Sequence, residues 1–158
     1  EIIKQLYDIG FLFDQITNLN VVKESYSRVV QEEIGFRKLN VNADEVLEDT
    51  WQACYTLAER DTKSDEFKHL QLGIKNFTNF IIDRFSIEEA ITASAKVAYL
   101  TTLLNKEENQ EIERFKNPLE IKDWLIEDQA YNKLNKLKKT NPEAFFYWYK
   151  TTKEMINL

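Results

Sequence analysis

Residues 86–105 read SIEEAITASAKVAYLTTLLN, and this stretch decides the fold. Ser86 and Glu89 have the spacing of a capping box, in which the first side chain and the carboxylate three residues later satisfy each other's backbone donors. The residues that follow are small and apolar on several sides of a helix, so that more than one neighbouring helix can pack closely against them. We therefore predict a helix here, at the centre of a bundle. Its small or apolar residues are Ala90, Ala93, Ala95, Val97, Ala98 and Leu100.

Outward from this helix, apolar residues recur at helical spacing in both directions along the chain. Asn42 and Glu45 form a second capping box, and Asn141 followed by Pro142 is typical of a helix start. The segment KEENQEIERFKN, residues 106–117, is either a short helix or a linker. The other expected helices cover residues 2–17, 21–39, 42–62, 64–81, 119–138 and the stretch from 142 onward.

Composition supports the same fold class. Only three Gly and two Pro occur in 158 residues, far fewer than sheet proteins need for their turns. We predict an all-α fold, an irregular bundle of seven to eight helices that forms a single domain over residues 1–158. The single cysteine, Cys54, excludes an internal disulfide framework and favours a reducing, cytoplasmic location. No apolar run is long enough to span a membrane, so we expect no membrane partner.

Several kinds of chemistry lack the residues they need. One His and one Cys cannot form a structural zinc site, and the chain has no glycine-rich phosphate loop. His69 is better explained as a residue at the edge of a helix's apolar face, and Arg60 is too distant in sequence to complete the Arg–His motif of HEPN ribonucleases. Glu45, Glu48 and Asp49 suit the start of a helix better than a metal site. We expect no metal site in this chain.

A basic segment near the C-terminus, YNKLNKLKKTNPEAFFYWYK, is a candidate nucleic-acid surface. Lysines beside aromatic rings suit phosphate contact and base stacking, although the net charge of −6 argues against a generally basic protein. The alternative is that Phe145, Trp148 and Tyr149 pack into the bundle while the lysines are simply solvated. The candidate nucleic-acid-binding residues are Lys133, Lys136, Lys138 and Lys139.

The first expected helix contains KQLYDIGFLFD, residues 4–14, in which charges interrupt an apolar run. At 100° per residue, Lys4, Asp8 and Gln15 share a narrow polar stripe. The opposite side carries Ile2, Leu6, Ile9, Phe13 and Ile16, and the stripe is bordered by Tyr7, Phe11 and Leu12. Asp8 would then face a cleft or an absent partner. An exposed Lys4–Asp8 pair is the alternative, but this order of charges contributes only about 0.2 kcal/mol.

This stretch resembles a segment of the nucleotidyltransferase AbiEii/AbiGii toxin family of abortive-infection and toxin–antitoxin systems, in which a basic residue precedes Tyr-Asp and an apolar run. Gln5 stands where that family commonly has an acidic residue. The resemblance extends over about residues 1–105. The other stretches of this sequence that resemble the family are YSRVVQEEIGFR, VLEDTWQACYTLA, FKHLQLGIKNF and AITASAKVAYLTTLL.

The resemblance implies that this chain is the helical C-terminal part of a longer protein. The family's N-terminal core carries a Gly-Ser turn and an acidic pair that binds Mg²⁺, and this chain has neither. By resemblance, Asp8 and Lys4 would be catalytic, with Lys4 near phosphates, and the partners would be an NTP, an RNA acceptor and an antitoxin. We expect the chain alone to be inactive. The alternative is a non-catalytic helical module that binds a partner protein.

Overall fold

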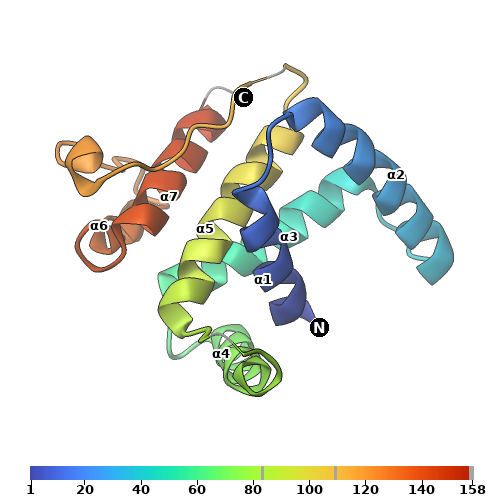
Figure 1. Ribbon diagram of the computed structural model, residues 1–158, viewed down its shortest axis with the longest axis horizontal. Helices are drawn as coiled ribbons and strands as arrows, with labels where there is room; N and C mark the ends of the chain where they lie inside the picture. The colour runs from blue at the N-terminus through green and yellow to red at the C-terminus, as the bar shows by residue number, and fades with distance from the viewer. Residues whose placement is uncertain (83, 109, 157–158) are drawn as a thin grey trace.

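The computed structural model describes residues 1–82, 84–108 and 110–156, which form an all-α bundle without strands (Figure 1). The all-α bundle predicted from the sequence is confirmed. Its α-helices are α1 (Ile2–Phe13), α2 (Leu19–Arg37), α3 (Ala43–Glu59), α4 (Asp65–Phe77), α5 (Ile87–Leu104), α6 (Leu137–Thr140) and α7 (Pro142–Ile156). Short 3₁₀ turns are η1 (Thr78–Phe80), η2 (Pro118–Ile121) and η3 (Asn132–Lys136).

Helix α5 is the centre of the bundle, as its sequence predicts. Nearly all its residues from Ala90 to Leu103 are buried, and α1, α3 and α7 pack against it on different sides (Figure 1). The capping box at its start is present, since Glu89 N–H donates to Ser86 Oγ at 3.4 Å and the Glu89 carboxylate accepts from Ser86 N–H. Small side chains on α5 therefore allow three helices to share one core.

The other helix starts also follow their capping signals. Asn42 Oδ1 accepts from Glu45 N–H at 2.9 Å, and Glu45 accepts in return from Asn42 N–H at 2.7 Å. Asn141 Oδ1 accepts from Ala144 N–H at 3.2 Å, which caps α7 ahead of Pro142. Residues 106–117 contain no helix where they are described, so the linker interpretation of that segment is confirmed.

The helix expected over residues 119–138 is wrong. This segment consists of η2, an irregular stretch, η3 and the one-turn helix α6. Asn135 occupies both backbone groups of Ile126, accepting from its N–H at 3.0 Å and donating to its carbonyl at 2.9 Å. Lys138 donates to the carbonyl of Trp124 at 2.7 Å. Side-chain bonds to the backbone thus replace the helical ladder here.

The first helix ends at Phe13 rather than at residue 17, and its inner face differs from the prediction. Its buried residues are Ile3, Leu6, Gly10 and Phe13, whereas Ile2 is 62% exposed and Ile9 is also exposed. The buried side includes Gly10, where α1 approaches α5 closely, and so does not follow the apolar stripe alone. None of the helices in the described residues is both long and apolar enough to cross a membrane.

Candidate functional site

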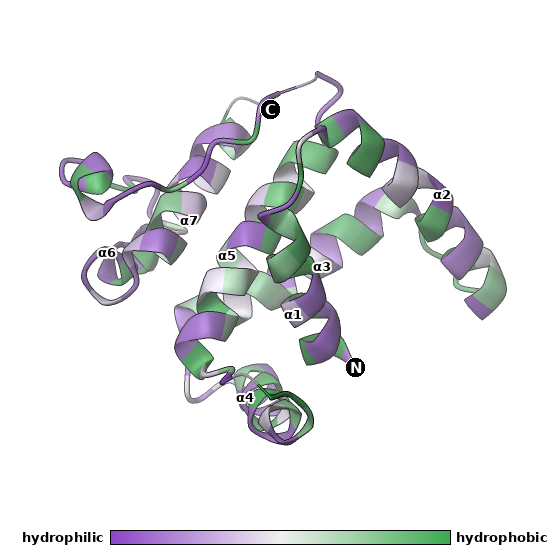
Figure 2. Cartoon of the chain, in the orientation of Figure 1, coloured by the Kyte–Doolittle hydropathy of each residue, from purple (hydrophilic) through white to green (hydrophobic). Residues whose placement is uncertain are grey.

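The outer face of α1, formed by Lys4, Asp8, Phe11 and Leu12, combines an ion pair with exposed apolar side chains. Phe11 is 66% exposed and Leu12 58% exposed, and they flank an ion pair in which Lys4 Nζ lies 2.6 Å from Asp8 Oδ2. Both charged side chains are exposed. Asp8 therefore lies on the surface rather than in a cleft of this chain. Figure 2 shows that hydrophobic and hydrophilic residues alternate along α1.

Close contacts with α5 and α4 hold α1 in place. A Cβ at Gly10 would lie only 2.7 Å from Ala93 Cβ, so the missing side chain is what allows α1 to reach α5. The ring of Tyr7 packs against Phe77 and Phe85, with centroid distances of 5.4 and 5.2 Å. The outer face is thus presented by a helix whose inner side is fixed.

A pocket of about 560 Å³ opens between the start of α1 and the neighbouring side of α4. We call it the α1/α4 pocket. It brings together Lys4 and His69, which the sequence singled out separately, whereas Asp8 is not among its lining residues. Asn76 and Phe80 were missed, because only the packing of α4 against α1 brings them into the same pocket as Lys4. Its lining residues are Glu1, Ile2, Ile3, Lys4, His69, Leu70, Gly73, Asn76, Phe77 and Phe80.

The other catalytic candidates have structural roles. Arg60 forms an ion pair with Glu88, and Glu45 completes a capping box. Glu48 accepts a hydrogen bond from Gln52 at 2.7 Å. Burial raises the pKa of Cys54 to about 12, which keeps its thiol protonated. Within residues 1–82, 84–108 and 110–156, no group of three or more His, Cys, Asp or Glu side chains could hold a metal ion.

The four candidate lysines of the basic segment lie on η3 and α6, and three of them bind groups of the protein. Lys133 pairs with Glu59 at 2.6 Å, Lys136 donates to the carbonyl of Glu59, and Lys138 donates to Trp124. Burial, together with nearby Arg60, lowers the pKa of Lys136. Lys139 makes no such contact in the described part of the chain. Phe145 and Trp148 are fully buried, which favours the interpretation that the aromatic residues belong to the core.

One buried lysine, which the sequence analysis did not single out, joins the end of α1, α5 and α7 through two partly exposed carboxylates. Lys96 Nζ lies 2.8 Å from Asp14 Oδ2 and 3.0 Å from Glu143 Oε1. Burial tends to lower the pKa of Lys96, but hydrogen bonds to these two carboxylates outweigh it and raise the pKa. The one available signal was a lysine within an apolar helix, because an ammonium group there needs a carboxylate partner.

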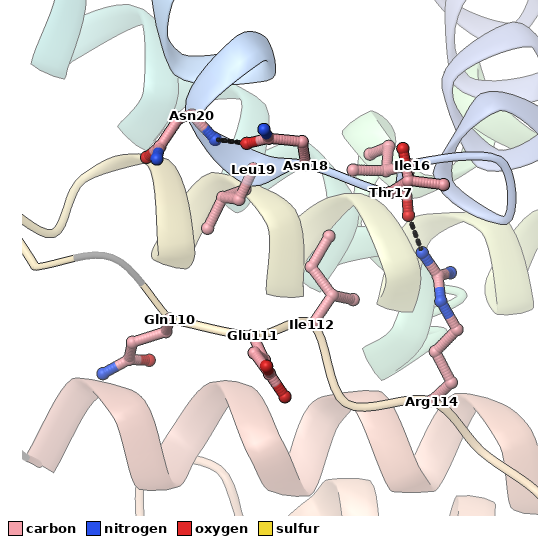
Figure 3. Close-up of a pocket in the computed structure, with 9 residues that line it drawn as sticks. All are labelled: Ile16, Thr17, Asn18, Leu19, Asn20, Gln110, Glu111, Ile112 and Arg114. Carbon is pink, nitrogen blue, oxygen red and sulfur yellow. Dashed lines mark hydrogen bonds between the residues drawn. The ribbon is translucent and has the colours of Figure 1, made fainter.

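Arg114 extends this group from the linker that follows α5. It donates to the carbonyls of Phe13 at 2.9 Å and Ile16 at 2.7 Å, and the second of these bonds is drawn in Figure 3. The guanidinium also lies 4.9 Å from the centroid of the Phe13 ring. A second pocket, of about 340 Å³, lies beside it between the α1–α2 turn and residues 110–112. The Arg114 side chain therefore already binds backbone carbonyls at the C-terminal end of α1.

Comparison with known proteins found no relative of this chain: no family model, curated protein or solved structure matches it.

Proposed function

We propose that this chain is the helical C-terminal domain of an AbiEii-like nucleotidyltransferase toxin, and that the outer face of α1 packs against the catalytic core. The observation that carries the proposal is the pair of exposed apolar side chains, Phe11 and Leu12, on either side of Lys4 and Asp8. The resemblance of KQLYDIGFLFD to that toxin family supports it, because the charged residues of the motif, Lys4 and Asp8, lie on this same face.

The core would supply the chemistry in this proposal. Phosphoryl transfer depends on metal-assisted positioning and charge stabilisation, and the family's acidic pair, with Mg²⁺, provides both. Lys4 would lie near the phosphates of the NTP and Asp8 would orient a group beside them. Their ion pair is a small obstacle, since an exposed pair with this order of charges contributes only about 0.2 kcal/mol.

The RNA acceptor would reach the domain through its basic segment. Because Lys133, Lys136 and Lys138 bind protein groups, this part of the proposal rests mainly on Lys139 and on Lys133, whose side chain stays exposed beside Glu59. Phosphate contacts release counterions, so RNA binding through these lysines weakens as salt rises. Equal RNA affinity at low and high salt would show that the lysines form only a solvated surface.

A second candidate function is a non-catalytic interaction module whose α1 outer face binds a protein such as an antitoxin. The same exposed apolar residues favour it, because large apolar patches on soluble domains commonly mark interaction sites. The two functions differ in what lies upstream in the gene. A coding sequence for a Gly-Ser turn and an acidic pair favours the enzyme, and a start codon immediately before Glu1 favours the module.

The test uses the natural gene product that contains this domain, with Mg²⁺, labelled NTPs and cellular RNA as acceptor. We expect Asp8→Asn to reduce nucleotide incorporation by at least about tenfold while the protein keeps its thermal stability, since the pair contributes little to folding. Glu33→Gln is the matched control, because Glu33 and Arg37 form a similarly exposed pair on α2 at 2.9 Å. Normal incorporation by the Asp8→Asn protein would refute the role given to Asp8.

A further inference from the structure

The α1/α4 pocket combines three kinds of polar group. Lys4 supplies a cation, His69 an imidazole, and Asn76 an amide that can both donate and accept. All three side chains are exposed, and in the described residues neither His69 nor Asn76 forms a side-chain hydrogen bond. Among the residues that the structure describes, the Lys4 side chain bonds to Asp8 alone. These polar groups are therefore available to a ligand.

Phe80 adds an exposed aromatic ring to the same pocket. Its side chain is 83% exposed, although a phenylalanine is favoured inside a protein. The turn that carries it is held in place, because Thr78 Oγ1 lies 3.0 Å from the carbonyl oxygen of Ile74 and 3.3 Å from that of Phe85. A ring presented in this way offers a flat face on which a nucleic-acid base can stack.

The walls of the pocket are set by close packing between α4 and α1. A Cβ at Gly73 would lie 2.9 Å from Ile3 Cγ1, so glycine at this position lets the two helices approach closely. The resulting volume of about 560 Å³ falls within the usual range for small-molecule sites, which is about 300–1,000 Å³. The pocket thus has room for a single nucleotide.

We propose that the α1/α4 pocket binds a nucleotide, with its base on Phe80 and Asn76 and its phosphate at Lys4 and His69. A base needs a stacking surface and a partner for its polar edge, and a phosphate needs cations or N–H donors; the pocket supplies each of these. The nucleotide is either a free NTP or the terminal residue of a single-stranded RNA. The inference rests on the proposed function and adds to it that a nucleotide binds beside α4.

Isothermal titration calorimetry on the 158-residue chain tests the pocket with two probes, ATP and a short single-stranded RNA. We expect at least one probe to bind, and we expect Phe80→Ala to weaken that binding by about tenfold, as the loss of one stacked base implies. Phe36→Ala is the matched control, because Phe36 lies at the end of α2 and is 86% exposed. The probe that binds identifies the source of the nucleotide.

A second pair of variants tests the phosphate contact. Lys4→Gln should weaken binding and make it less dependent on salt, whereas Arg37→Gln, which removes a similar exposed pair on α2, should do neither. The inference is overturned if neither probe binds the unaltered chain. It is also overturned if Phe80→Ala and Phe36→Ala change the affinity equally.

The outcome separates this inference from the proposed function. Binding that depends on Phe80, together with a natural gene product that transfers no nucleotides, would refute the enzyme and leave the pocket as a nucleotide-binding site. A gene product that transfers nucleotides equally well with Phe80→Ala, and a chain whose binding ignores that change, would refute the pocket and leave the enzyme.

Discussion

Replacing Gly10 with alanine tests the contact that holds α1 on α5. An added Cβ would lie 2.7 Å from Ala93 Cβ and 3.2 Å from Ala93 Cα. Carbon atoms are best separated by about 3.5–4.0 Å, so the helices would have to move apart by about 1 Å. Ala93 has no side-chain torsion that could relieve the overlap. The substitution must therefore loosen the packing between the two helices.

The expected free-energy change combines two opposing effects. Overpacking a core costs about 1–3 kcal/mol, and a contact with a rigid methyl group and backbone belongs in the upper part of that range. Alanine is favoured over glycine in a helix by about 1 kcal/mol. The net expectation is a loss of about 1–2 kcal/mol of stability. Gly35→Ala is the control, because no atom lies within 4 Å of its added Cβ. It should stabilise the protein by about 0.5–1 kcal/mol.

Urea unfolding followed by far-ultraviolet circular dichroism measures both changes as shifts of the midpoint at constant slope. A Gly10→Ala protein as stable as the Gly35→Ala protein would refute the reasoning. Adding Ala93→Gly to the Gly10→Ala protein removes the opposing methyl group, so the two substitutions should interact favourably by about 1 kcal/mol. Additive effects would place the cause of the destabilisation elsewhere.

Two further predictions concern buried titratable groups. The pKa of Lys96 is raised above its ordinary 10.5. The stability contributed by its ammonium group is therefore complete below about pH 10.5 and is lost as pH rises through the higher pKa of the folded state. The Lys96→Met protein should lack this loss of stability at alkaline pH. If the stability of the unaltered protein and that of the Lys96→Met protein fell equally with rising alkaline pH, the result would contradict this prediction. Because burial raises the pKa of Cys54 to about 12, native protein near pH 8 should react with iodoacetamide at least about a hundredfold more slowly than unfolded protein. Mass spectrometry measures both rates, and equal labelling would contradict the prediction.

The sequence predicted best where a helix is specified locally. The Ser86 and Asn42 capping boxes depend on residues three positions apart, and the helices they open begin where expected. The helix expected over 119–138 failed because contacts from other elements decide that segment. Trp124 stacks on Tyr149 at a centroid distance of 4.5 Å, and Asn135 holds the backbone of Ile126. The spacing of apolar residues within the segment predicts neither of these contacts.

The candidate site was predictable only in part, for a related reason. Lys4 and Asp8 are one helical turn apart, so their shared face could be foreseen. The α1/α4 pocket depends on Gly73 meeting Ile3, and the buried position of Lys96 depends on Asp14 and Glu143, each from a distant part of the chain. The apolar pattern of α1 also concealed the role of Gly10, which faces the core without an apolar side chain of its own.

The aromatic cluster between α3 and α7 determines what intrinsic fluorescence can report. Trp51 and Trp148 lie edge to face with their ring centroids 5.6 Å apart, and Trp124 stacks on Phe146 and Tyr149 of α7. The three indoles of the protein therefore belong to α3, α7 and the segment before η3, and α1 and α4 carry none. Detachment of α1 from α5 would leave the emission spectrum nearly unchanged while helical dichroism falls. Disagreement between these two signals would identify α1 as a separately unfolding unit.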